Sequence, residues 1–118
     1  MKTKLIALAV LAVPILAAPA LAGDRIVDCY VDPGQGAEFR GPCLFTPLRG
    51  GSFTLEHRNP NRLLDGYISR IDVDIVAPSV AEVTVLTSDG KYHWGKARRS
   101  TSDPACWVGS DFTICARG

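Results

Sequence analysis

The stretch from Ile68 to Val76 reads Ile-Ser-Arg-Ile-Asp-Val-Asp-Ile-Val and alternates apolar with polar side chains. Ile71, Val73 and Ile75 fall on one side of an extended chain, and the residues between them fall on the other. Strict alternation with β-branched residues is typical of a strand that buries one face. The stretch is therefore the clearest predicted β-strand in the chain.

The chain on either side of this strand reads as further short strands separated by turns. Pro78-Ser79 ends the first strand, and the β-branched run 81–87 is expected to form a hairpin with it. Gly90 allows the positive φ of the next turn, after which 92–98 predicts a third strand. The remaining candidate strands are 26–31, 42–45, 52–57, 106–108 and 112–115. Seven or eight short strands with a turn about every ten residues predict an all-β domain, a small antiparallel barrel or sandwich.

Helix has little support outside the N-terminal segment. The best window is 61–70, where Leu63, Leu64 and Tyr67 have approximate helical spacing. Gly66 weakens a helix there, and the window is short, so one helical turn is the most that we expect. No repeat or low-complexity linker divides the chain, and a single β domain over residues 23–118 is expected.

Residues 1–22 have the features of a secretory signal peptide. Lys2 and Lys4 precede an apolar run over 5–16, and Ala-Leu-Ala at 20–22 has the small-x-small form of a cleavage site. We expect cleavage after this site and a periplasmic or secreted protein of the cell envelope. The apolar run is shorter than the roughly 20 residues of a membrane span. A glycine rather than a lipid-acceptor cysteine follows the site, so no membrane anchor is expected.

The charge balance argues against a polyanionic partner. The chain has 118 residues and a formal net charge of +1. Without the predicted signal peptide, 96 residues remain, with 11 basic and 12 acidic side chains and a net charge of −1. A nucleic-acid-binding domain needs a clear positive surplus, so no nucleic-acid partner is expected.

The four cysteines all lie in the part of the chain that we expect to be exported. An even number of cysteines in a small exported domain predicts a disulfide framework. Four cysteines allow three pairings, and we favour Cys29 with Cys43 and Cys106 with Cys115, because each pair flanks a short, turn-rich segment. Zinc sites use cysteines two to four residues apart, a spacing that is absent here, so no metal site is expected.

Residues for catalysis are few. His57 and His93 are the only histidines, and both fall in predicted strands or strand ends, outside any catalytic motif. None of the serines has a Gly-x-Ser-x-Gly setting. Asp72 and Asp74 alternate on the polar face of one strand, a position typical of solvated acids. We therefore expect no enzyme activity, no catalytic residue and no cofactor.

The segment 87–99 combines a tight turn, two aromatic residues and four cations in thirteen residues. Protein interfaces are rich in aromatic and arginine side chains, so this segment is the predicted partner-binding site. Its candidate residues are Ser88, Gly90, Lys91, Tyr92, Trp94, Lys96, Arg98 and Arg99. An exposed Trp94 would favour binding over a purely structural role, whereas Trp107 and Phe112 are expected to be packed inside.

The run Ser88-Asp89-Gly90-Lys91-Tyr92 resembles the Ser-Gly-x-Tyr or Ser-Gly-x-x-Tyr loop of small periplasmic inhibitors of lysozyme-type peptidoglycan hydrolases, with one residue changed or inserted, so that Asp89 precedes the glycine. Trp94-Gly95-Lys96 is similar to their second, lysine-containing motif in altered order. Members of that family are exported, disulfide-containing β-barrels. The resemblance implies a protein partner, a lysozyme or lytic transglycosylase, whose acidic cleft the turn would enter to bind the catalytic carboxyl group. A rigid turn loses little entropy on docking, and Arg98 and Arg99 would speed association.

Two other functions fit the same residues. A glycan-binding module would use Tyr92, Trp94 and Trp107 as stacking platforms for peptidoglycan, and exposed aromatic residues in a line would favour it. A structural protein of the cell envelope would need no specific ligand. A second sharp turn beside the turn at Ser88 would favour the inhibitor over the glycan-binding module.

Overall fold

The alternating stretch forms a long strand in a computed structural model that describes residues 23–118. This strand, β4 (Ile68–Ala77), pairs antiparallel with β5 (Val80–Thr87) across a turn at Pro78-Ser79. Ile71 and Val73 are fully buried, while Asp74 on the other face is exposed. The predicted hairpin and the orientation of its two faces are therefore confirmed.

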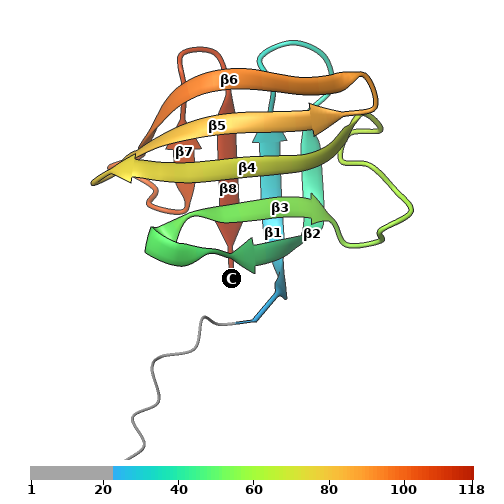
Figure 1. Ribbon diagram of the computed structural model, residues 1–118, viewed down its shortest axis with the longest axis horizontal. Coiled ribbons are helices and arrows are strands. Elements are labelled where there is room, and N and C mark those ends of the chain that lie inside the picture. The colour runs from blue at the N-terminus through green and yellow to red at the C-terminus, as the bar shows by residue number, and fades with distance from the viewer. Residues whose placement is uncertain (1–22) are drawn as a thin grey trace, which may run out of the picture.

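Eight strands close into a barrel in which each strand pairs antiparallel with its neighbours in the chain and β1 pairs with β8 (Figure 1). Besides β4 and β5, the strands are β1 (Arg25–Asp32), β2 (Phe39–Pro47), β3 (Phe53–His57), β6 (Gly90–Arg99), β7 (Cys106–Val108) and β8 (Thr113–Arg117), with a 3-10 turn η1 (Arg49–Gly51). Strands β3 to β6 cross steeply in front of β7, β8 and β1, and the end of β2 bends round to run beside β3 (Figure 1). Of the two expected architectures, the barrel is the one that forms, and its closure gives each of the eight strands a neighbour on both sides.

Branched aliphatic side chains fill the barrel interior. Every strand contributes inward-facing residues to one cluster, which also includes Leu64 from the segment before β4. The branched aliphatic side chains that are most deeply buried are those of Val31, Leu55, Leu64, Ile68, Ile71, Val73, Val83, Val85 and Ile114. An eight-stranded barrel has an interior just wide enough for such side chains, so the inside is a packed core. Binding must therefore use the outer surface, the turns or the two ends.

Two disulfides join neighbouring strands of the barrel. Cys29 in β1 is bonded to Cys43 in β2, and Cys106 in β7 is bonded to Cys115 in β8. Both predicted pairings are confirmed. Two buried disulfides are consistent with an oxidising, extracytoplasmic compartment. The predicted signal peptide, residues 1–22, lies outside the residues that the structure describes, and within 23–118 no helix has the length and apolar character of a membrane span.

The helical turn considered for 61–70 does not form. Leu64 and Ile68 instead form an isolated antiparallel β-bridge. The Leu64 N–H donates to the Ile68 carbonyl at 2.8 Å, and the Ile68 N–H donates to the Leu64 carbonyl at 2.9 Å. Between them, Asp65 and Gly66 adopt φ values of 60° and 67°, which reverse the chain. The apolar residues of this window do not share a buried face, since Leu64 is buried in the core while Tyr67, in the turn, is exposed.

Candidate functional site

The turn between β5 and β6 is held by its own hydrogen bonds. The Thr87 hydroxyl accepts a bond from the Asp89 N–H at 3.0 Å and donates one to the Gly90 carbonyl at 3.2 Å. Gly90 has a φ of 138°, as predicted for this turn, and Ser88 is exposed beside it. The turn therefore presents the Ser88 and Asp89 side chains on a backbone that is fixed before any partner arrives.

A β-bulge in β6 changes which side chains point outward. Gly95 pairs with Val83 and His93 pairs with Thr84, so Trp94 lies between them without a partner on β5. Gly95 has a φ of 110°, which suits the irregular backbone at this point. Residues before and after the bulge therefore do not follow a single alternation.

The outward side of β6 carries a row of basic side chains as a result of the bulge. This basic row consists of Lys91, His93, Lys96 and Arg98, all of them exposed. Glu82 on β5 is the acidic side chain that faces it, with its carboxylate 3.0 Å from Nε2 of His93 and its backbone paired with Lys96. Three of the four predicted cations thus share one face of one strand.

The other predicted side chains are distributed differently. Tyr92 is 45% exposed. Trp94 is only partly exposed and packs against the core, with its ring 5.3 Å from that of Phe112. Trp107 and Phe112 are buried as expected. Arg99 lies at the far end of β6, about 30 Å from Gly90 at the usual rise per residue, and is therefore not part of the turn between β5 and β6.

A second tight turn lies beside the turn between β5 and β6. Ile68 at the start of β4 pairs with Thr87 at the end of β5, which brings the Asp65-Gly66 turn next to the Ser88 turn. Both turns lie at the same end of the β4–β6 sheet (Figure 1). Burial raises the pKa of Asp65 in this turn.

This second turn adds two large exposed side chains, Leu63 at 37% and Tyr67 at 46% exposure. We call the end of the β4–β6 sheet that carries the exposed residues Leu63, Tyr67, Ser88, Lys91 and Tyr92 the two-turn corner. Sequence reasoning did not place Leu63 and Tyr67 in the site. The signal for the turn was present, since Asp-Gly is a preferred hairpin dipeptide.

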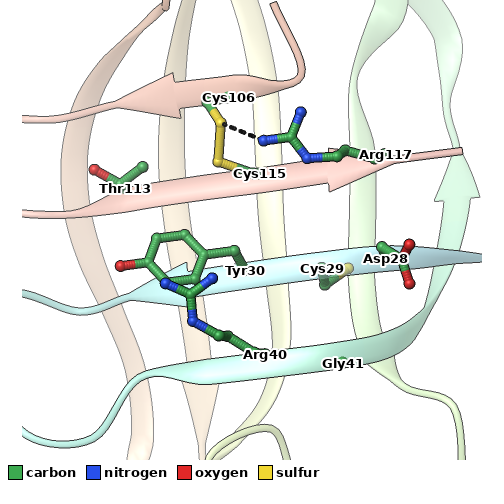
Figure 2. A pocket seen from close by; sticks show the side chains of 9 residues that line it. All are labelled: Asp28, Cys29, Tyr30, Arg40, Gly41, Cys106, Thr113, Cys115 and Arg117. Atoms are coloured by element: carbon green, nitrogen blue, oxygen red, sulfur yellow. Dashed lines mark hydrogen bonds between the residues drawn. A yellow bond between two sulfur atoms is a disulfide. The ribbon is translucent and has the colours of Figure 1, made fainter. Parts of the chain in front are cut away.

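A hollow of about 570 Å³ lies elsewhere, on the outer side of β7, β8, β1 and β2 (Figure 2). Tyr30, Arg40 and Arg117 in its lining already have partners. The Arg40 guanidinium stacks over the Tyr30 ring at 4.2 Å, and the Tyr30 hydroxyl donates to Glu38 at 2.9 Å, which raises the pKa of Tyr30.

The other side of the same hollow is closed by an ion pair and a disulfide. Arg117 binds Asp103 through two hydrogen bonds and also lies 3.9 Å from the sulfur of Cys106 (Figure 2). These bonds lower the pKa of the Asp103 carboxyl and raise that of the Arg117 guanidinium. Because these groups are already bonded within the protein, the hollow has fewer free polar groups for a ligand than its size indicates.

The remaining chemistry-bearing side chains have structural contacts. Nδ1 of His57 accepts a hydrogen bond from the Asn59 N–H at 2.9 Å. Asp72 pairs with Arg70 at 2.7 Å along the outer face of β4. Within residues 23–118, no three His, Cys, Asp or Glu side chains cluster in a way that would hold a metal ion. The two-turn corner with its adjacent basic row is therefore the strongest candidate site.

Comparisons with protein-family models, with curated proteins and with solved structures give no match to this chain.

Proposed function

We propose that the protein is a periplasmic inhibitor of a lysozyme-type peptidoglycan hydrolase or lytic transglycosylase, which it blocks by inserting the two-turn corner into the substrate cleft. The observation that carries this proposal is the pairing of Ile68 with Thr87, which sets two rigid turns side by side, with the exposed Tyr67 in one of them and the exposed Tyr92 on β6 just beyond the other. A pair of turns forms a narrow, convex wedge, the shape that fits a cleft.

The chemistry of the corner is complementary to a glycosidase cleft. Such a cleft contains a catalytic acid with a raised pKa and a carboxylate beside it. The hydroxyl groups of Ser88 and Tyr92 and the ammonium group of Lys91 are hydrogen-bond donors that match carboxyl oxygens. Tyrosine supplies contact area at a small cost in side-chain entropy, which is why it is frequent among the residues that dominate binding energy.

The basic row extends the same complementarity along β6. Lys91, Lys96 and Arg98 would face the acidic rim of the cleft and steer the two proteins together. Such steering weakens at ionic strengths where the Debye length falls below about 10 Å. Inhibition that sets in more slowly as salt is raised is therefore expected.

The glycan-binding alternative has less support. It requires a line of exposed aromatic rings, but Trp107 is buried and Trp94 packs against Phe112. Tyr92 and Tyr67 remain exposed, yet they belong to separate elements, Tyr92 to β6 and Tyr67 to the turn before β4.

The proposal is tested by the clearing of a cell-wall suspension by c-type lysozyme and, separately, by a lytic transglycosylase, each with and without the purified protein. We expect inhibition at micromolar protein or below. The Tyr92→Ala and Tyr67→Ala variants should each weaken inhibition by at least about 10-fold, in the range of residues that dominate an interface. Ile26→Ala is the matched control, because Ile26 is equally exposed but lies on β1.

The result that would overturn the proposal is unchanged clearing by both enzymes at 100 µM protein. Sedimentation of the protein with insoluble peptidoglycan in that case would assign the glycan-binding function instead. Equal loss of inhibition in the Ile26→Ala control would show that the corner is not the contact surface.

A further inference from the structure

The end of the barrel opposite the corner brings together two arginines from distant parts of the chain. Arg25 begins β1, and its guanidinium lies over the Phe45 ring, 4.5 Å from the centroid. Arg99 ends β6, and its guanidinium lies over the Trp107 ring, 4.8 Å from the centroid. Both arginines line one hollow of about 180 Å³.

Neither guanidinium is neutralised within the part of the chain that the structure describes. No carboxylate oxygen of residues 23–118 lies within 4.0 Å of Arg25 or Arg99. Arg70 and Arg117, by contrast, each pair with an aspartate. Asp103 is next to Pro104 in the wall of the hollow, but its carboxylate is already engaged by Arg117. The hollow therefore has two positive groups and no free acid among its lining residues.

The rings beneath the two guanidinium groups are themselves fixed. Phe45 stacks on Phe53 with centroids 4.8 Å apart and an interplanar angle of 22°. Trp107 is only 3% exposed and is opposite Ile114 in the β7–β8 pair. A guanidinium that stacks by its face on a ring keeps its N–H donors in the plane, where they remain free to bind. The rings thus hold two sets of donors in place at modest entropic cost.

We propose that this end of the barrel is an oxyanion-binding site, in which Arg25 and Arg99 together bind a carboxylate or phosphate group. Arginine binds both groups through paired hydrogen bonds, and charge assistance strengthens these bonds. The hollow has room for a single such group with a short substituent, and the mouths of β-barrels are common ligand sites. The site does not depend on the proposed inhibitor function, since Arg99 lies about 30 Å from the tip turn.

The test is a titration of the protein with inorganic phosphate and, separately, with acetate, at constant ionic strength set by potassium chloride. The side-chain N–H signals of Trp107, Arg25 and Arg99 in nitrogen–proton correlation spectra report binding. We expect saturable shifts at these three residues with a dissociation constant in the millimolar range. The stronger of the two anions identifies the source of the group, phosphate or carboxylate.

Variants separate a specific site from general attraction of anions. Arg99→Gln should raise the dissociation constant by at least 5-fold, and Arg99→Lys, which keeps the charge but not the planar donors, by at least 3-fold. Arg98→Gln is the matched control, because Arg98 is the exposed neighbour on the outer side of the same strand, and it should change the constant by less than 2-fold. Thermal unfolding of each variant checks that the barrel is intact. If Arg99→Gln does not fold, the Arg99→Lys result decides the matter.

Three results would overturn the proposal. The first is an absence of saturable shifts up to 50 mM of either anion. The second is an equal response to chloride alone, which would reduce the effect to screening. The third is an equal loss of binding in Arg98→Gln and Arg99→Gln together with unchanged binding in Arg99→Lys, which would show that net charge alone attracts the anion and that the two guanidinium groups serve only to cover the rings.

Discussion

Gly109 occupies a position where one added methyl group has a large effect on stability. A Cβ atom built on Gly109 would lie 2.1 Å from Cε1, 2.3 Å from Cζ and 2.5 Å from Cδ1 of the Phe112 ring. Carbon atoms in contact are normally about 3.5–4.0 Å apart, so the ring would have to move by roughly 1.5 Å. The Gly109 N–H also donates to the Phe112 carbonyl at 2.8 Å, which leaves the turn little freedom to open.

The Gly109→Ala variant should therefore lose about 2–3 kcal/mol of unfolding free energy. Overpacking costs about 1–3 kcal/mol when the surroundings shift, and moving a buried phenylalanine into water costs about 1.5–3 kcal/mol. For a domain of this size the midpoint of thermal unfolding should fall by about 10–20 °C. Trp94 fluorescence should change as well, because its ring packs against Phe112.

Urea unfolding of four proteins tests this reasoning: the unchanged protein, Gly109→Ala, Phe112→Val and the double variant. Since valine lacks the three ring atoms, the alanine should cost less than about 0.5 kcal/mol in the Phe112→Val background, a coupling of more than 1 kcal/mol. Ser110→Ala, in the same turn but exposed, should stay within about 0.5 kcal/mol of the unchanged protein. Equal costs of the alanine in both backgrounds would refute the steric argument.

Further predictions concern one disulfide, one ion pair and the turn between β5 and β6. Replacing Cys29 and Cys43 together by alanine should lower the unfolding free energy by about 3 kcal/mol, the loop-entropy value for a separation of 14 residues, in urea titrations without reductant. Hydrogen bonds from Arg117 hold the pKa of Asp103 below its ordinary value of 3.8, so their stabilisation is complete well above pH 4 and is lost as the pH falls through the folded pKa. The Asp103→Asn variant should accordingly show a smaller fall in its urea midpoint between pH 6 and pH 2.5 than the unchanged protein. Gly90→Val forces a β-branched residue to a φ of 138°, and should cost about 1–3 kcal/mol while it abolishes inhibition in the cell-wall assay.

The strand pattern could be predicted from the sequence because it depends on local alternation. Ile71, Val73, Val83 and Val85 occupy every second position, and this period is enough to locate β4 and β5 and their buried faces. The disulfide pairings followed from the turn-rich segments between the cysteines. The sequence did not decide between a barrel and a sandwich. The pairing of β1 with β8, which closes the barrel, joins residues far apart in the chain and produces no local sequence pattern.

The site could be predicted only in part, for two physical reasons. First, the alternation rule assumes regular pairing, and the bulge at Trp94 breaks it, so Tyr92, Trp94 and Lys96 do not share a face. Second, which turns lie side by side is decided by strand register. Tyr67 lies at the same end of the sheet as Tyr92 because Ile68 pairs with Thr87. Sequence distance likewise hid the approach of Arg25 to the hollow that Arg99 lines.

The ring of strands has a single seam that joins residues far apart in the chain. Every other pairing links consecutive strands, so each hairpin can zip up as soon as its second strand is available, whereas β1 must wait for β8, more than eighty residues later. Until then both β1 and the last completed strand expose open edges that invite association with other chains. A chain that is incompletely synthesised or trimmed at its C-terminus should thus be prone to aggregate. A covalent link between β1 and β8, which are neighbours in the closed barrel, should shorten the time for which their edges are open.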